Sequence, residues 1–176
     1  QNYTDMGFFS IILFLLIGTI LTMIVQASAA TMAITLIMCA NGWISLELGA
    51  ALVLGENIGT TITANLAALT ANTQAKRAAL AHFVFNVFGV IWVLIVFHPF
   101  MELVNWVVDT FFQSNNPEVA ISYKLSAFHS IFNICNVCIL IWAVKLIERT
   151  VCALIHPKEE DEEPRLRFIT GGMLST

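Results

Sequence analysis

Long uncharged apolar stretches constrain this chain most, because some of them run into short polar motifs. Residues 7–25 carry no charged side chain. At 1.5 Å per residue such a stretch approaches the ~30 Å hydrocarbon core of a bilayer. Backbone N–H and C=O groups left unpaired in lipid are costly, so a chain with these stretches must be helical within the membrane. The sequence therefore predicts an all-α, polytopic membrane protein.

The composition agrees with a location in the bilayer. Of the 176 residues, 58% are hydrophobic and 11% are charged, whereas soluble domains carry about 25% charged residues. Much of the net charge of -4 comes from an acidic run at residues 159–163, and no basic patch indicates nucleic-acid binding. We expect one transmembrane unit over residues 1–157 and a charged cytoplasmic tail or linker over residues 158–176.

Two polar motifs, at residues 26–31 and 55–61, interrupt the apolar runs. The apolar arm after the first motif ends near Asn41 and Gly42 and is short for a crossing. Residues 7–39 therefore favour a re-entrant helical hairpin, with two complete spans as the alternative. Residues 46–54 and 61–69 are each about half a span, so we expect one broken transmembrane helix with its break at residues 55–60.

The second half of the chain indicates two full transmembrane helices. Residues 78–97 form the first of these, and residues 100–112 read as an interfacial amphipathic helix. A polar loop is expected at residues 113–124, and the last span is expected at residues 125–144. The positive-inside rule places Lys76, Arg77 and the tail in the cytoplasm, with the N-terminus and the 113–124 loop outside.

The polar motifs contain residue types that bind ions. Transporters use helix N-termini to hold anions, and they use carbonyl, amide and hydroxyl oxygens to hold cations, at helix breaks within the membrane. Gln26 and Ser28 in the first motif, and Asn57, Thr60 and Thr61 in the second, fit this design. The alternative is that small polar residues permit close helix packing.

An acidic residue in the second motif has three open interpretations. Glu56 directly follows Gly55 within an apolar environment. It is expected to help bind a cation, to point toward solvent, or to pair with another helix.

A short repeat places His and Asn one helical turn apart in each of the two predicted full spans. The pairs are His82 with Asn86 and His129 with Asn133, and Asn136 extends the second face. Helix-to-helix hydrogen bonding is one interpretation. A proton relay or a metal site is the other, although no carboxylate lies near either His in the sequence.

Together these motifs resemble the sodium-dependent phosphate cotransporters of type II, in their bacterial branch. That family carries a Gln-Ser-Ser-Ser-Ala-Thr signature followed by Gly-x-Asn-Ile-Gly-Thr-Thr. The present chain reads Gln26-Ala27-Ser28-Ala29-Ala30-Thr31 and then Gly55-Glu56-Asn57-Ile58-Gly59-Thr60-Thr61. The resemblance continues through residues 75–86 and 129–133, so it covers nearly all of the membrane part.

The resemblance implies a sodium-coupled symporter for inorganic phosphate and not an enzyme. Sodium is the implied coupling ion, and no further cofactor is expected. Ala27 and Ala29 replace hydroxyls of the family signature, so these two positions lack the ligands that serines would supply. The residues that the resemblance assigns to phosphate are Gln26, Ser28 and Thr31, and those that it assigns to sodium are Ser28, Asn57, Thr60 and Thr61.

The resemblance also implies that this chain is one half of a transport unit built from two inverted repeats. It looks like the second, C-terminal repeat, and it would need a missing N-terminal repeat or a second chain to complete the site. In bacterial relatives the tail leads to a PhoU-like cytoplasmic domain. The implied location is the cell membrane, inner or plasma. The rival functions are a membrane-embedded regulatory or scaffold protein and a transporter of another oxyanion.

Overall fold

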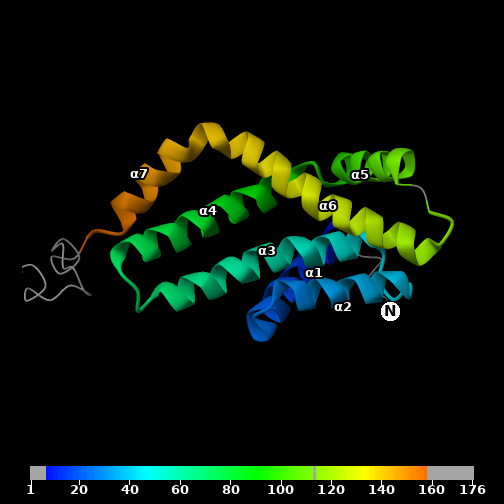
Figure 1. The fold of residues 1–176 in the computed structure, drawn as a ribbon, viewed down its shortest axis with the longest axis horizontal. Coiled ribbons are helices and arrows are strands. Elements are labelled where there is room, and N and C mark those ends of the chain that lie inside the picture. Colours follow the sequence, from blue (N-terminus) through cyan, green and yellow to red (C-terminus); the bar gives the residue numbers. More distant parts are fainter. Residues whose placement is uncertain (1–6, 113, 158–176) are drawn as a thin grey trace, which may run out of the picture.

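The structure, a computed structural model that describes residues 7–112 and 114–157, consists of helices throughout this part (Figure 1). This confirms the all-α prediction. Residues 1–6 and the predicted tail at residues 158–176 lie outside the described part. The helices are α1 (Phe8–Val25), α2 (Ser28–Ala40), α3 (Leu46–Ala68), α4 (Thr73–Ile95), α5 (Phe97–Phe111), α6 (Pro117–Leu140) and α7 (Val144–Leu154), with a 3-10 turn, η2 (Ile141–Ala143), between the last two.

The first polar motif does interrupt the chain. Gln26 ends α1 in the left-handed region, with φ 56°, and its N–H donates to the carbonyl of Thr22 at 2.8 Å. Ala27 is extended, and α2 starts at Ser28 in the opposite direction. Figure 1 shows that this turn lies partway along α3 and not beyond either of its ends.

The predicted break at residues 55–60 is wrong, because α3 runs without interruption from Leu46 to Ala68. The polar side chains of the motif hydrogen-bond to carbonyls of their own helix. Asn57 donates to the Val53 carbonyl at 3.1 Å, and Thr60 donates to the Glu56 carbonyl at 2.8 Å. Such bonds keep polar groups satisfied inside an intact helix, so polar composition alone does not indicate a break.

The glycines of the second motif serve helix packing. A Cβ on Gly55 would collide with the carbonyl oxygen of Leu15, and one on Gly59 would lie 2.6 Å from that of Thr19. On α1, a Cβ at Gly18 would likewise meet the backbone of Leu52. The backbones of α1 and α3 therefore touch, as small residues allow between membrane helices.

The connection after α4 forms the predicted amphipathic helix. In α5 the apolar residues Phe97, Phe100, Val104 and Val108 are buried. Pro99 is tolerated because it lies in the first turn, where its missing N–H has no helical partner.

The predicted polar loop at residues 113–124 is mostly helical, because α6 already begins at Pro117. Asn116 caps this helix by accepting a hydrogen bond from the N–H of Glu118 at 2.9 Å, and proline suits the first helical position. The predicted span at residues 125–144 is accordingly shifted. The helix α6 starts earlier than the predicted span and ends at Leu140. The chain then continues through the 3-10 turn into α7.

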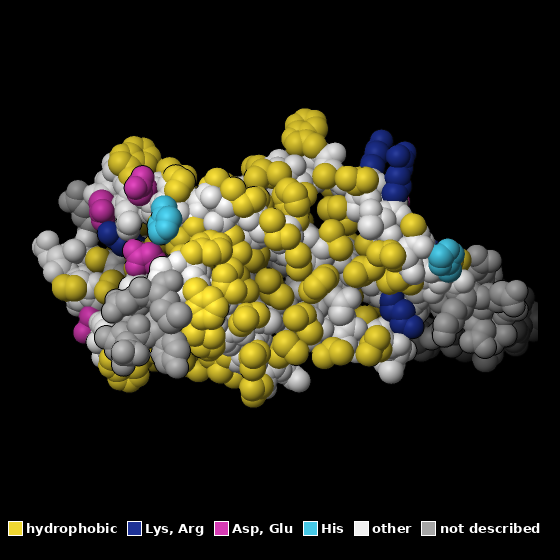
Figure 2. All heavy atoms as spheres, turned by 180° about the vertical axis from the view of Figure 1, so that it is seen from behind, with side chains coloured by type: hydrophobic (Ala, Val, Ile, Leu, Met, Phe, Trp, Pro, Cys, Tyr) yellow, Lys and Arg dark blue, Asp and Glu magenta, His cyan; other side chains and the backbone are white. Residues whose placement is uncertain are grey.

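The two ends of the molecule differ in charge. Arg77 at the start of α4 donates two hydrogen bonds, of 3.0 and 2.9 Å, to the carbonyl of Ile155 after α7. Figure 2 shows acidic side chains gathered at one end, most Lys and Arg side chains at the other, and an apolar belt between them. Among the described residues, the helical segments long and apolar enough to cross a membrane are Phe8–Val25, Thr73–Ile95 and Pro117–Leu154.

Candidate functional site

A polar cavity of about 290 Å³ lies where α2 begins, against the middle of α3 and beside α4 and α6. It brings together three of the predicted site residues, Ser28, Asn57 and Thr60. The lining residues are Ser28, Ala29 and Met32 of α2, Glu56, Asn57 and Thr60 of α3, His82 and Asn86 of α4, and His129 of α6.

The start of α2 lies at this cavity and has no side-chain cap. Its N-cap is Ala27, which has no side chain that accepts a hydrogen bond. The first N–H groups of a helix have no partner within the helix, and they carry the positive end of its dipole. Because Ser28 and Ala29 line the cavity, the cavity has the features of an anion site at this wall.

The α3 wall supplies oxygen atoms. The amide of Asn57 uses its Nδ2 group on the Val53 carbonyl, which leaves the Oδ1 atom as an acceptor. Thr60 uses its hydroxyl hydrogen on the Glu56 carbonyl, and its oxygen retains lone pairs. Uncharged oxygens of this kind are ligands for hard cations.

Glu56 lies in the same wall and is 4% exposed. Its Oε1 atom accepts a hydrogen bond from the hydroxyl of Thr35 on α2, at 2.9 Å. Thr35 is fully buried, so the contact lies inside the helix packing. The interpretation that Glu56 points toward solvent is therefore wrong.

The histidines of the sequence repeat line the cavity from α4 and α6. Asn86 and Asn133 each donate to the carbonyl of the His one turn earlier, at 3.3 and 2.8 Å, so these bonds stay within one helix. Among the described residues, neither imidazole takes part in a hydrogen bond. The repeat thus marks residues that line the cavity. Its hydrogen bonds do not connect α4 with α6.

A hydrogen-bonded contact between α4 and α6 is made by Asn136. Its Nδ2 donates to the Phe85 carbonyl at 3.1 Å, and its Oδ1 accepts from the indole N–H of Trp92 at 3.2 Å. Asn136 is fully buried between α4 and α6. The sequence indicates it only as an extension of the His129 face.

The other predicted site residues lie outside the cavity walls. Gln26 is exposed at the turn before α2. Thr31 is fully buried and donates to the Ala27 carbonyl at 3.3 Å. Thr61 is also fully buried, and it donates to the Ile58 carbonyl at 2.7 Å.

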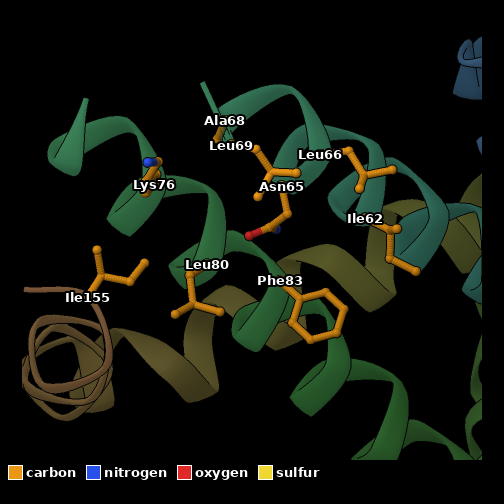
Figure 3. Close-up of a pocket in the computed structure, with 9 residues that line it drawn as sticks. All are labelled: Ile62, Asn65, Leu66, Ala68, Leu69, Lys76, Leu80, Phe83 and Ile155. Carbon is orange, nitrogen blue, oxygen red and sulfur yellow. The ribbon is translucent and has the colours of Figure 1, made fainter. Parts of the chain in front are cut away.

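A second pocket, of about 380 Å³, has a different chemistry (Figure 3). Apolar side chains such as Ile62, Leu66 and Phe83 form its walls, with Lys76 at the helix start. Its amide side chain, Asn65, already donates to the carbonyls of Thr61 and Ala79 at 2.8 and 2.9 Å. Such walls suit apolar groups, so the polar cavity is the candidate ion site.

A family profile and individual relatives of known sequence all point to one family. The sequence profile of the Na+/Pi-cotransporter family matches residues 9–109. The uncharacterized protein YqeW of Bacillus subtilis is 35% identical over 144 residues, which cover 82% of this chain and 44% of YqeW. Sodium-dependent phosphate transport protein 2C of Rattus norvegicus is 40% identical over 94 residues, or 51% of this chain and 16% of that protein.

The human sodium-dependent phosphate transport protein 2B is 41% identical over 81 residues, which cover 44% of this chain and 12% of the relative. The chain thus spans less than half the length of these relatives. No solved structure matches it.

Proposed function

Because the chain belongs to the Na+/Pi-cotransporter family, we propose that it acts in sodium-coupled uptake of inorganic phosphate across the cell membrane. In this proposal the polar cavity is its half of the ion and substrate site. The observation that carries the proposal is the meeting of an uncapped helix N-terminus with amide and hydroxyl oxygens in one cavity. These are the two kinds of group that an anion and a cation need side by side.

Phosphate binds, in this proposal, at the start of α2. The N–H groups of Ser28 and Ala29 and the hydroxyl of Ser28 are its donors. Gln26 and Thr31, which the family resemblance also assigns to phosphate, lie outside the cavity walls. A contact from either needs the other half of the site or a different conformation.

Sodium binds along α3. Asn57 Oδ1, Thr60 Oγ1 and Ser28 Oγ are the proposed ligands, because all three residues line the cavity. Thr61 has the same residue type as Thr60 but faces the helix packing, so its assignment as a ligand depends on a separate test.

The hairpin of α1 and α2 is re-entrant in this arrangement. Support comes from the position of its turn, since Ser28 shares a cavity with Thr60, eight residues before the end of α3. Lys76 and Arg77 then lie in the cytoplasm together with α7, and the α5–α6 connection lies outside. A second repeat or a second chain completes the site.

The test is phosphate uptake by the full-length protein in proteoliposomes, as a function of sodium. We expect Thr60→Val to raise the sodium concentration for half-maximal uptake about tenfold, because it removes one ligand oxygen and keeps the side-chain shape. Thr63→Val is the matched control, since Thr63 bonds the Thr60 carbonyl at 2.9 Å and lies outside the cavity. Thr61→Val in the same series decides whether that hydroxyl contributes.

Three outcomes would contradict the proposal. An absence of phosphate uptake by the unmodified protein would favour a regulatory or scaffold role, and uptake that does not depend on sodium would contradict the sodium coupling. Sulfate that competes equally with phosphate would favour a transporter of another oxyanion, because helix N-termini do not distinguish the two anions by themselves.

A further inference from the structure

A carboxylate is buried among the helices, and no cation of the described residues pairs with it. Glu56 lies ten residues after the first residue of α3, or about 15 Å along the helix. It lines the polar cavity and is 4% exposed. An isolated charge in such an environment costs several kcal/mol unless it is paired or binds a metal ion.

Charged groups of the other described helices have partners other than Glu56. The ion pair within the described residues joins Lys124 to Asp109, at 3.0 Å, near the start of α6. Arg77 on α4 bonds the Ile155 carbonyl. No Lys or Arg lines the cavity, and its two imidazoles, His82 on α4 and His129 on α6, form no ion pair with Glu56 in the part that the structure describes.

The carboxylate is also oriented by a specific contact. Thr35 on α2 donates to Oε1, and the described residues supply no hydrogen bond to Oε2. The hydroxyl of Thr35 lies 3.1 Å from the Thr31 carbonyl as well, so α2 fixes its position. One carboxylate oxygen is thereby left in the same cavity as the oxygens of Asn57 and Thr60.

We propose that Glu56 is the charged ligand of a monovalent hard cation in the polar cavity, and that Thr35 is a positioning residue for its carboxylate. This inference rests on the sodium-coupled function proposed above, and it adds the group that neutralises the ion. A carboxylate beside neutral oxygens raises the affinity for a cation by direct attraction. The cation in turn neutralises a charge that the described residues leave unpaired.

The experiment measures binding of radioactive sodium to the purified full-length protein, without phosphate. We expect Glu56→Gln to weaken sodium binding at least about tenfold, because it removes the charge and keeps the shape. Glu47→Gln is the matched control, since Glu47 lies in the first turn of the same helix and outside the cavity.

A second pair of variants tests the positioning residue. Thr35→Val should weaken sodium binding by about threefold, because the carboxylate loses the bond that holds one oxygen. Thr35→Ser should restore most of the affinity, because it keeps the hydroxyl. The thermal unfolding midpoint in detergent is measured for each variant. If Glu56→Gln does not fold, sodium binding is measured on Glu56→Asp instead, which keeps the charge.

The possible failures are distinguishable. If the unmodified protein binds sodium and Glu56→Gln binds it equally well, Glu56 is a packing group and this inference alone is overturned. If the unmodified protein does not bind sodium, both this inference and the proposed function fail. Equal losses in Thr35→Val and Thr35→Ser would overturn the positioning role of Thr35.

Discussion

Both polar motifs interrupt apolar runs of the sequence, yet they differ in backbone structure. At residues 26–31 the helix stops, because Gln26 adopts a left-handed conformation with φ 56° and Ala27 is extended. At residues 55–61 the helix continues, although this motif contains two glycines and more polar side chains. A left-handed residue reverses the chain, whereas polar side chains alone do not.

The reason lies in where each polar group finds a partner. Thr60 and Asn57 bond carbonyls one turn back in the same helix, so the backbone bonds of α3 can stay intact. Gly55 and Gly59 provide space for the α1 backbone. The first motif instead places the start of α2 at a cavity. Together the two segments line this cavity with a helix start and a helix side.

The largest expected effect concerns the packing role of the second motif. Gly55→Ala should lower the free energy of unfolding by about 2–3 kcal/mol, because the added Cβ meets the rigid backbone carbonyl of Leu15. The thermal unfolding midpoint of the full-length protein in detergent measures this change.

The control for this variant lies on the same helix. A Cβ on Gly49 would meet the side-chain sulfur of Cys39, which can rotate away. Gly49→Ala should therefore change stability by less than about 1 kcal/mol, since alanine also favours the helix by about that amount. A Gly55→Ala variant as stable as the unmodified protein would disprove the packing role of this glycine.

A smaller effect is expected at the turn in the first motif. Gln26→Gly should raise the free energy of unfolding by about 1 kcal/mol, because glycine adopts the left-handed region without steric cost. The same exchange at Gln74, in the first turn of α4, should lower stability. Thermal unfolding of both variants checks the difference, and destabilisation by Gln26→Gly would show that the Gln26 side chain stabilises the turn.

The smallest effect is expected at the start of α2. Ala27→Ser should stabilise the protein by about 0.5 kcal/mol, because serine at an N-cap accepts a hydrogen bond from the first turn. Ala30→Ser, inside the helix, is the control and should give no gain. If Ala27→Ser leaves the unfolding midpoint unchanged, the first amides of α2 already have partners in the complete protein.

Hydrophobic length alone identified most of the fold. The spans around α4 and α6 and the amphipathic α5 follow from the apolar pattern. The start of α6 was misplaced because polarity at residues 113–124 reads as loop, whereas Asn116 and Pro117 are a capping residue and a first helical residue. The continuity of α3 was not predicted, because amino-acid composition does not show whether a polar side chain bonds a carbonyl of its own helix.

The cavity residues were predictable from the sequence where they belong to a motif, and they were not predictable where helix packing brings them together. Ser28, Asn57 and Thr60 belong to the polar motifs, and His82 and His129 belong to the repeat. The hydrogen bond from Thr35 to Glu56 could not be predicted, because it depends on how α2 rests on α3. The role of Asn136 between α4 and α6 has the same origin.

The glycine contact between α1 and α3 also limits how the cavity can change shape. Where two backbones touch, no layer of rotatable side chains lies between them to allow the sliding seen in shear motions. We therefore expect the two helices to move as one rigid body. One wall of the cavity is fixed to that body through Asn57 and Thr60, so we expect any change in the shape of the cavity to come from displacement of α4, α6 or the start of α2.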